Sequence, residues 1–265
     1  MVVLQQPCVR FRKDPSFLLK YDAKWLVGLL LASAGMWWLG WTGLEVSLAT
    51  AAVALPFLIY LSIFSHLVVH NAAHGNIWGG HDVLVGEFCG MFVGTRYAAW
   101  DILHQRHHAF PDDPVKDPHP VEPSYWSFVF RKMILNLEPN LQQQYLERFG
   151  DTPRNRLKVQ LRSALGVVTT VALALFWWLA LGSTVFFLCF LPATVFSALF
   201  VAHFNWVTHE GLDENGVSQI RDLDTGYYWV ANRILFGIYM HATHHKNPRL
   251  FNPVRATVAQ RAPAV

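Results

Sequence analysis

Two long stretches of the chain carry almost no charge. Between Trp25 and His81 the only charged residue (Asp, Glu, Lys or Arg) is Glu45, and between Ser163 and His209 there is none. One helical crossing of a bilayer needs about 20 apolar residues, so each stretch is long enough for two crossings. The pattern therefore predicts two transmembrane hairpins, which turn near residues 40–45 and at Gly182-Ser183.

Other segments are apolar or helical but too polar to span. Residues 83–100 and 227–240 are apolar but include charged side chains, which favours helices that lie in the membrane interface. Residues 138–162 are predicted as a polar helical stretch. The four predicted spans cover residues 25–44, 46–69, 164–181 and 184–201.

The basic residues indicate an orientation. All 21 Lys and Arg residues lie in three segments, 10–24, 96–162 and 221–261. With four spans these segments share one side of the membrane, and the positive-inside tendency makes that side cytoplasmic. We therefore expect a multi-pass integral membrane protein with both termini in the cytoplasm.

Composition excludes several classes of protein. Charged residues make up only 15% of the chain, against about 25% in soluble domains. A net charge of +3 is too near balance for a nucleic-acid binder with a broad basic surface, so we expect no nucleic-acid partner. The three cysteines are far apart, so we expect reduced thiols rather than a disulfide framework.

Thirteen histidines are the unusual abundance, and eight of them fall into three motifs. These are HxxxH at residues 70–74, HxxHH at 104–108 and HxxHH at 241–245. On a helix, positions i, i+3 and i+4 share a face, so each motif can direct two or three rings at one place. Neutral imidazole is a ligand for iron, copper, zinc and nickel.

The predicted topology brings these motifs to one side of the membrane. The second span ends just before His70 and His74, and the fourth delivers Asn205 and His209 to the same side. Nine or ten donors are too many for one zinc ion and favour two five- or six-coordinate ions. The HExxH signature of metalloproteases is absent. A bis-histidine haem would need isolated histidines within the spans, so a paired iron centre fits best.

The motifs and their order resemble a known superfamily. They read HNAAHG from His70, HQRHH from His104 followed by DPHP, and HATHHKNP from His241, with the NxxxH element Asn205–His209 before the last. Over roughly residues 66–255 the chain resembles the membrane fatty-acid desaturase and hydroxylase superfamily of non-haem diiron enzymes. The NxxxH element is similar to that of acyl desaturases and alkane hydroxylases.

The resemblance implies a ligand set for two iron ions. Asn205 is a direct or water-mediated tenth partner of these ions, while His66, Asp101 and Asp117 are candidates for contacting and orienting the ligands. His119 and His203 are expected to be hydrogen-bonding or surface residues, with Arg106 expected to face phosphate or a carboxylate. The implied iron ligands are His70, His74, His104, His107, His108, His209, His241, His244 and His245.

The expected fold is an all-α membrane protein, one functional domain with four transmembrane helices in two hairpins, interfacial helices and a cytoplasmic helical cap holding the diiron site. Its parts are a cytoplasmic segment (1–24), the first hairpin and histidine motif (25–81), an interfacial helix with the second motif and cap (82–162), the second hairpin (163–209), and an interfacial helix with the third motif and the C-terminus (210–265).

The implied function is O2-dependent oxidation of an unactivated C–H bond in a lipid drawn from the bilayer. Fatty-acyl desaturation is the favoured reaction. Hydroxylation of an alkane, fatty acid or carotenoid is the alternative, and a non-enzymatic metal or haem protein is a third reading. The sequence has no HPGG signature of a cytochrome b5 module. We therefore expect electrons from a separate ferredoxin, rubredoxin or cytochrome b5 with its reductase.

Overall fold

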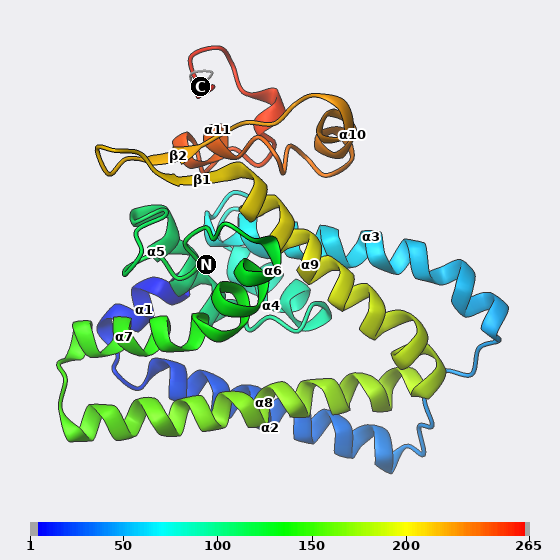
Figure 1. Ribbon diagram of the computed structural model, residues 1–265. Coiled ribbons are helices and arrows are strands. Elements are labelled where there is room, and N and C mark those ends of the chain that lie inside the picture. The colour runs from blue at the N-terminus through cyan, green and yellow to red at the C-terminus, as the bar shows by residue number, and fades with distance from the viewer. Residues whose placement is uncertain (1–4, 263–265) are drawn as a thin grey trace.

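The computed structural model describes residues 5–262, and most of these residues are helical (Figure 1). The outermost residues of the expected terminal segments, 1–4 and 263–265, lie outside the described residues. The helices are α1 (Pro7–Lys13), α2 (Phe17–Trp38), α3 (Leu48–Ala73), α4 (Asp82–Phe92), α5 (Tyr97–Ala109), α6 (Tyr125–Ser127), the π-helix η1 (Phe128–Leu135), α7 (Leu137–Phe149), α8 (Pro153–Val185), the π-helix η2 (Phe186–Phe190), α9 (Leu191–Thr208), α10 (Gly226–Ile234), α11 (His241–Lys246) and the short 3-10 helix η3 (Pro253–Arg255).

Two helical runs are long and apolar enough to cross a membrane. They are Leu48–Ala73, which is α3, and Pro153–Thr208, which joins α8, η2 and α9. Gly182 breaks the second run with a φ of 73°, where the sequence predicts a turn, and Figure 1 shows the chain reversing after α8. The first predicted span, residues 25–44, differs from α2 at both ends. The helix begins earlier, at Phe17, and it ends earlier, at Trp38, because the chain leaves the helix at Leu39 and Gly40.

The long helices pack in two sets. α2 lies along α8, and α3 lies against α9 and α4 (Figure 1). The turns after α2 and α8 are joined, because Trp41 Nε1 donates to the Ala180 carbonyl at 2.9 Å. A Cβ atom on Gly43 would lie 2.5 Å from the Cα atom of Gly182, so this contact requires glycine.

Three predicted helices are broken where glycines adopt positive φ angles. Residues 83–100 form two helices, α4 and α5, because the chain turns at Gly94 (φ 68°). Residues 138–162 divide into α7 and the start of α8 at Gly150 (φ 91°), followed by the N-cap Thr152. Residues 227–240 leave α10 after Ile234 and turn at Gly237 (φ 80°).

The expectation of a purely helical fold is wrong between His209 and Ile220. Here β1 (His209–Leu212) pairs with β2 (Ser218–Ile220) in an antiparallel hairpin. The Asp213 carboxylate accepts hydrogen bonds from the backbone N–H groups of Asn215 and Val217, which closes the turn. Because α9 ends at Thr208, the hairpin begins on His209 and holds that side chain at the end of the helix.

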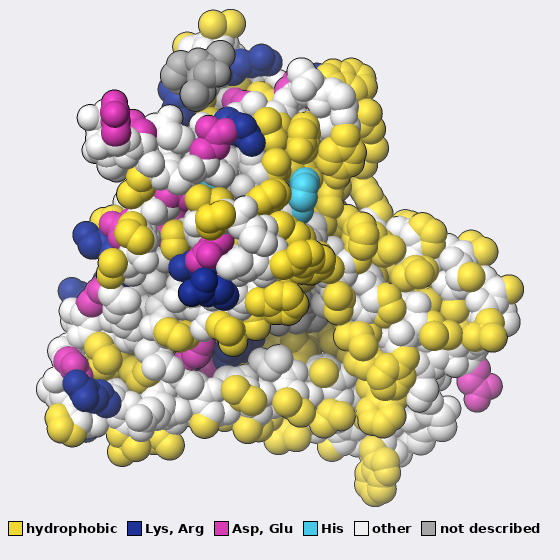
Figure 2. Space-filling model, viewed as in Figure 1, with side chains coloured by type: hydrophobic (Ala, Val, Ile, Leu, Met, Phe, Trp, Pro, Cys, Tyr) yellow, Lys and Arg dark blue, Asp and Glu magenta, His cyan; other side chains and the backbone are white. Residues whose placement is uncertain are grey.

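Charged and hydrophobic side chains occupy different parts of the surface (Figure 2). Acidic and basic side chains gather over α7, the start of α8 and the β1–β2 hairpin, while the surface over α3 and α9 is mostly hydrophobic. Large apolar side chains are exposed on the four long helices α2, α3, α8 and α9, among them Leu31, Val53, Phe57, Val167 and Phe196. Contiguous apolar surface of this extent is typical of a membrane-facing belt.

Candidate metal centre

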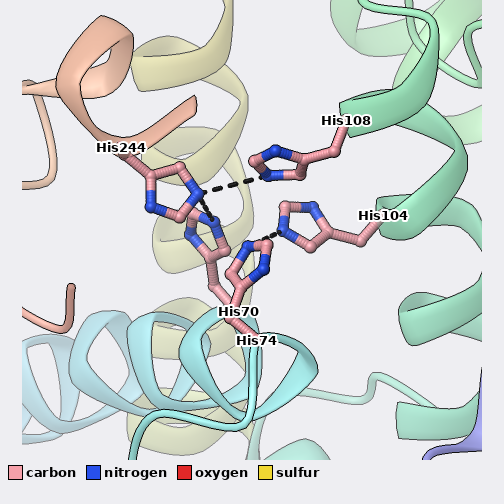
Figure 3. A group of neighbouring side chains, drawn as sticks. All are labelled: His70, His74, His104, His108 and His244. Atoms are coloured by element: carbon pink, nitrogen blue, oxygen red, sulfur yellow. Dashed lines mark hydrogen bonds between the residues drawn. The ribbon is translucent and has the colours of Figure 1, made fainter. Parts of the chain in front are cut away.

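Three separate helices bring five histidines together, and we call these the five-histidine group. His70 lies in the last turn of α3 and His74 caps that helix, while His104 and His108 lie on α5 and His244 on α11. Their ligating nitrogens all lie within 4.8 Å of one another. Figure 3 shows the five rings converging on one space from three sides.

The Nε2 atoms of the five-histidine group face each other. His70 Nε2 lies 2.9 Å from His244 Nε2, and His74 Nε2 lies 2.8 Å from His104 Nε2. His244 Nε2 is also 3.2 Å from His108 Nε2. A neutral imidazole nitrogen either donates one proton or offers one lone pair, so it cannot serve several like neighbours well. A central metal ion would accept all five lone pairs, which is the partner this donor set fits.

Four further histidines form the four-histidine group. His107 on α5, His209 at the start of β1, and His241 and His245 on α11 also place their ligating nitrogens within 4.8 Å of one another. The Nε2 atoms of His107 and His209 are buried and have no hydrogen-bond partner. A buried polar atom without a partner costs about 1–3 kcal/mol, so these two nitrogens also fit a bound metal.

Buried carboxylates hold the other nitrogen of these two rings. His107 Nδ1 donates to Asp117, with both carboxylate oxygens 3.0 Å away. His209 Nδ1 donates to Asp112 Oδ2 at 2.9 Å. A carboxylate only accepts, so each proton stays on Nδ1 and each Nε2 lone pair faces the four-histidine group.

The loop between α5 and α6 fixes both carboxylates. The backbone N–H of Asp112 donates to Asp117 Oδ2 at 2.6 Å, and that of His119 donates to Asp117 Oδ1 at 2.9 Å. The Ser218 hydroxyl, from β2, donates to Asp112. Asn136 Nδ2 anchors the loop by donating to the Pro118 carbonyl at 2.7 Å. The loop therefore holds the two carboxylates that orient His107 and His209.

Burial favours the neutral form of several of these imidazoles by lowering their pKa. Loss of hydration lowers the pKa of His104, His107 and His241 well below the ordinary histidine value, and neighbouring imidazoles add to the effect. Burial lowers the pKa of His74 to about 4. Neutral imidazole is the form that binds a metal ion, so the rings need not release protons at physiological pH.

Of the two acidic residues expected to orient the ligands, one contacts a histidine ring and the other does not. Asp117 contacts a histidine ring as expected, whereas the hydrogen bonds of Asp101 go to the Cys8 N–H at 2.6 Å and to Gln105 rather than to a ring. Asp112 was missed. It shares a proline-rich segment with Asp113, and only the placement of His209 distinguishes the two carboxylates.

Two other predicted residues belong to neither group. Asn205 is buried on α9, four residues before His209, and its amide nitrogen donates to the Val201 carbonyl at 3.0 Å. His66 lies one turn before His70 on α3 but belongs to neither group. Its buried Nδ1 has no hydrogen-bond partner, and its side chain lines a cavity.

The structure also tests the predictions for His203, His119 and Arg106. His203 Nδ1 lies 3.0 Å from the Tyr239 hydroxyl, so it is a hydrogen-bonding residue. His119 is buried within the loop rather than at the surface. Arg106 faces a carboxylate, because its two terminal nitrogens contact Glu147 at 2.7 and 3.2 Å.

A cavity of about 520 Å³ lies near the five-histidine group, and although none of the five rings lines it, the neighbouring Trp100 does. The Trp100 ring, which lines it, stacks on His104 with 5.3 Å between ring centroids and 11° between planes. Figure 2 shows the surface hollowed between η1 and α8, with mostly hydrophobic side chains around the opening. The apolar lining includes Val129, Met133, Ile134, Leu137, Val195, Leu199 and Val201.

Comparison with known proteins gives one match. Residues 45–251 match the family described as fatty acid desaturase, a range that includes both histidine groups. Searches of curated proteins and of solved structures found no match.

Proposed function

The chain belongs to the fatty acid desaturase family, and from this premise we propose that it is a membrane oxidoreductase that uses O2 to desaturate a lipid acyl chain. The observation that carries the proposal is the convergence of nine histidines in two adjoining groups. His107 belongs to the four-histidine group and also lies next to the five-histidine group. Its ring centroid lies 5.0 Å from that of His209 and 5.8 Å from that of His108. Such a donor set fits two metal ions held side by side.

We assign one iron ion to each histidine group. Asn205 is proposed as an oxygen ligand, direct or through water, to complete the set. Bound there, two iron ions would supply the redox chemistry that couples the reduction of O2 to water, with two electrons from the donor protein, to the oxidation of an unactivated C–H bond. The protein contributes the geometry: Asp112 and Asp117 keep the protons of His209 and His107 on Nδ1, and apolar walls exclude water.

The cavity is the proposed substrate site. Its walls are mostly apolar. The Trp100 ring lines the cavity and stacks on the ring of His104. A lipid chain in this cavity would lie beside the five-histidine group, where rigid helices set which carbon is nearest. The electrons are proposed to come from a separate donor protein of ferredoxin, rubredoxin or cytochrome b5 type with its reductase.

The proposed topology has four crossings. α3, α8 and α9 supply three of them, and the apolar part of α2, which packs along α8, supplies the fourth. The histidine groups and both termini then lie on the side that carries the Lys and Arg residues, which is the cytoplasmic side. A substrate can reach the cavity directly from the bilayer in this arrangement.

Lipid profiling tests the proposed reaction. A host that expresses the chain should contain lipids lighter by two hydrogens, and His107→Ala or His244→Ala should abolish them. His81→Ala, which changes a histidine outside both groups, should retain the product. A gain of one oxygen would instead identify hydroxylation, and undiminished product in the His107 and His244 variants would refute a metal centre at these residues.

A further inference from the structure

Charged side chains interrupt the apolar wall of the cavity at one place. Arg96, Glu138 and Arg162 line the cavity there, and Asp22 lies directly behind them with 1% of its surface exposed. We call these four residues the polar cluster. They come from α2, the start of α5, α7 and α8, so four elements converge on this point.

The charges of the polar cluster balance. Asp22 accepts from Arg96 Nη1 at 2.5 Å and from Arg162 Nε at 3.2 Å. Arg162 Nη1 contacts Glu138 Oε2 at 2.6 Å. Two guanidinium groups thus face two carboxylates, and a further buried charge would lack a counter-ion.

The cluster has hydrogen-bond donors without acceptors. Arg162 is 5% exposed, and its Nη2 atom is buried without a hydrogen-bond partner. Arg96 donates to Asp22 through Nη1. A Cβ atom on Gly166 would lie 2.7 Å from Arg96 Nη1, so glycine leaves the space that this guanidinium fills. The cluster is therefore balanced in charge but not in hydrogen-bond acceptors.

We propose that the polar cluster binds the head of a single-chain lipid through an uncharged acceptor oxygen, as in a long-chain alcohol, aldehyde or ester. A free carboxylate would add a third negative charge beside Glu138, and an uncompensated buried charge is costly. A neutral oxygen instead accepts a hydrogen bond from a guanidinium group that lines the cavity, without changing the charge balance. This inference rests on the proposed oxidation of a lipid in the same cavity.

The polar cluster also has a fixed relation to the metal centre. Arg96, Trp100 and His104 follow one another at intervals of four residues, which places them along one face of α5. The eight residues from Arg96 to His104 correspond to about 12 Å along the helix axis. In a lipid anchored at the cluster, the carbon nearest the five-histidine group therefore lies at a fixed number of carbons from the polar end.

Binding to the full, iron-loaded chain tests the proposal, with O2 and reductant excluded so that no turnover occurs. The probes are hexadecanol, methyl palmitate and ionised palmitate. We expect the two neutral probes to bind about tenfold more tightly than palmitate, because only palmitate adds a negative charge beside Glu138. Tighter binding of palmitate, or equal binding of all three, would overturn the proposal.

Two variants examine the cause of this preference. Glu138→Gln removes the negative charge that opposes a carboxylate, so palmitate should gain about tenfold in affinity relative to hexadecanol. Glu214→Gln makes the same substitution in the exposed β1–β2 turn and should leave the ratio unchanged. An unchanged ratio in Glu138→Gln would contradict the charge argument, and the wild-type ratio remains decisive if that variant does not fold.

Product analysis separates this inference from the proposed function. With alcohols of increasing length, oxidation should occur at a constant number of carbons from the polar end. A position that is constant from the methyl end would overturn the anchoring role while leaving the oxidation intact. If the neutral lipids bind as expected but no lipid is oxidised, the proposed function fails and the binding site stands.

Discussion

At the scale of single residues, the two histidine groups differ in how their rings are held. In the four-histidine group, His107 and His209 each donate Nδ1 to a buried carboxylate. In the five-histidine group, several Nε2 atoms lie within hydrogen-bond distance of each other. Carboxylates behind a ring fix its orientation and make its other nitrogen a better ligand. The metal affinity of the four-histidine group should thus depend most on residues that are not ligands themselves.

Replacing Asp112 tests that dependence. Asp112→Ala removes the acceptor of His209 Nδ1, and loss of such a partner commonly lowers metal affinity about 10- to 100-fold. Iron retained after dialysis against a chelator is the measurement. Asp113→Ala is the matched control, because the Asp113 side chain only closes a local turn through the Val115 and Lys116 N–H groups. Equal iron loss from both variants would contradict the assigned role.

Glu87 allows a prediction about pH. It accepts a hydrogen bond from the Tyr21 hydroxyl at 2.6 Å, and burial raises its pKa from 4.5 to about 7. The folded-state pKa is above the unfolded one, so the stabilising contribution is complete below about pH 4.5 and is lost as the pH rises through about 7.

Glu87→Gln keeps an acceptor for Tyr21 and removes the titrating group. Above pH 7 the variant should therefore be more stable than the wild type by roughly 1–3 kcal/mol, with no gain below pH 4.5. Thermal unfolding midpoints at the two pH values are the measurement. An equal gain at both would show that ionisation of Glu87 is not the cause.

At the scale of helices and strands, the charge-free runs predicted the long helices but not where they end. The absence of charge reveals α3, α8 and α9, and the turn at Gly182 was predicted. The breaks at Gly94 and Gly150 were missed because a glycine within an apolar or polar run does not show which φ it adopts. The β1–β2 hairpin carries a signal in Asn215-Gly216, a pair favoured in hairpin turns, that was overlooked.

The contact between the two helix-connecting turns gives a prediction at this scale. Gly43→Ala places a Cβ atom 2.5 Å from backbone atoms of Gly182, and backbone atoms have little room to move. We expect a loss of about 1–3 kcal/mol in stability beyond the cost of the positive φ, measured by thermal unfolding.

Gly40→Ala is the control for that experiment. Gly40 also has a positive φ, of 66°, but a Cβ atom there meets nothing within 4 Å. The difference between the two variants therefore isolates the contact with Gly182. A Gly43 variant as stable as the Gly40 variant would mean that the turns can separate.

At the scale of the whole molecule, the chain assembles its site from segments far apart in sequence. The three histidine motifs and the NxxxH element predicted nine histidines as ligands, and the structure brings all nine into two adjoining groups. The cavity and the polar cluster could not be predicted, because the cavity lining comes from six helical elements whose packing no local pattern specifies. The sequence thus identified the histidines that converge, while the fold determines what lies beside them.

The metal content of the full chain purified from membranes tests the central claim most directly. The account predicts two iron ions per chain, with His244→Ala and His107→Ala each lowering the iron content because they alter the five- and four-histidine groups respectively. One metal ion per chain, stoichiometric zinc in place of iron, or undiminished iron in both variants would contradict it.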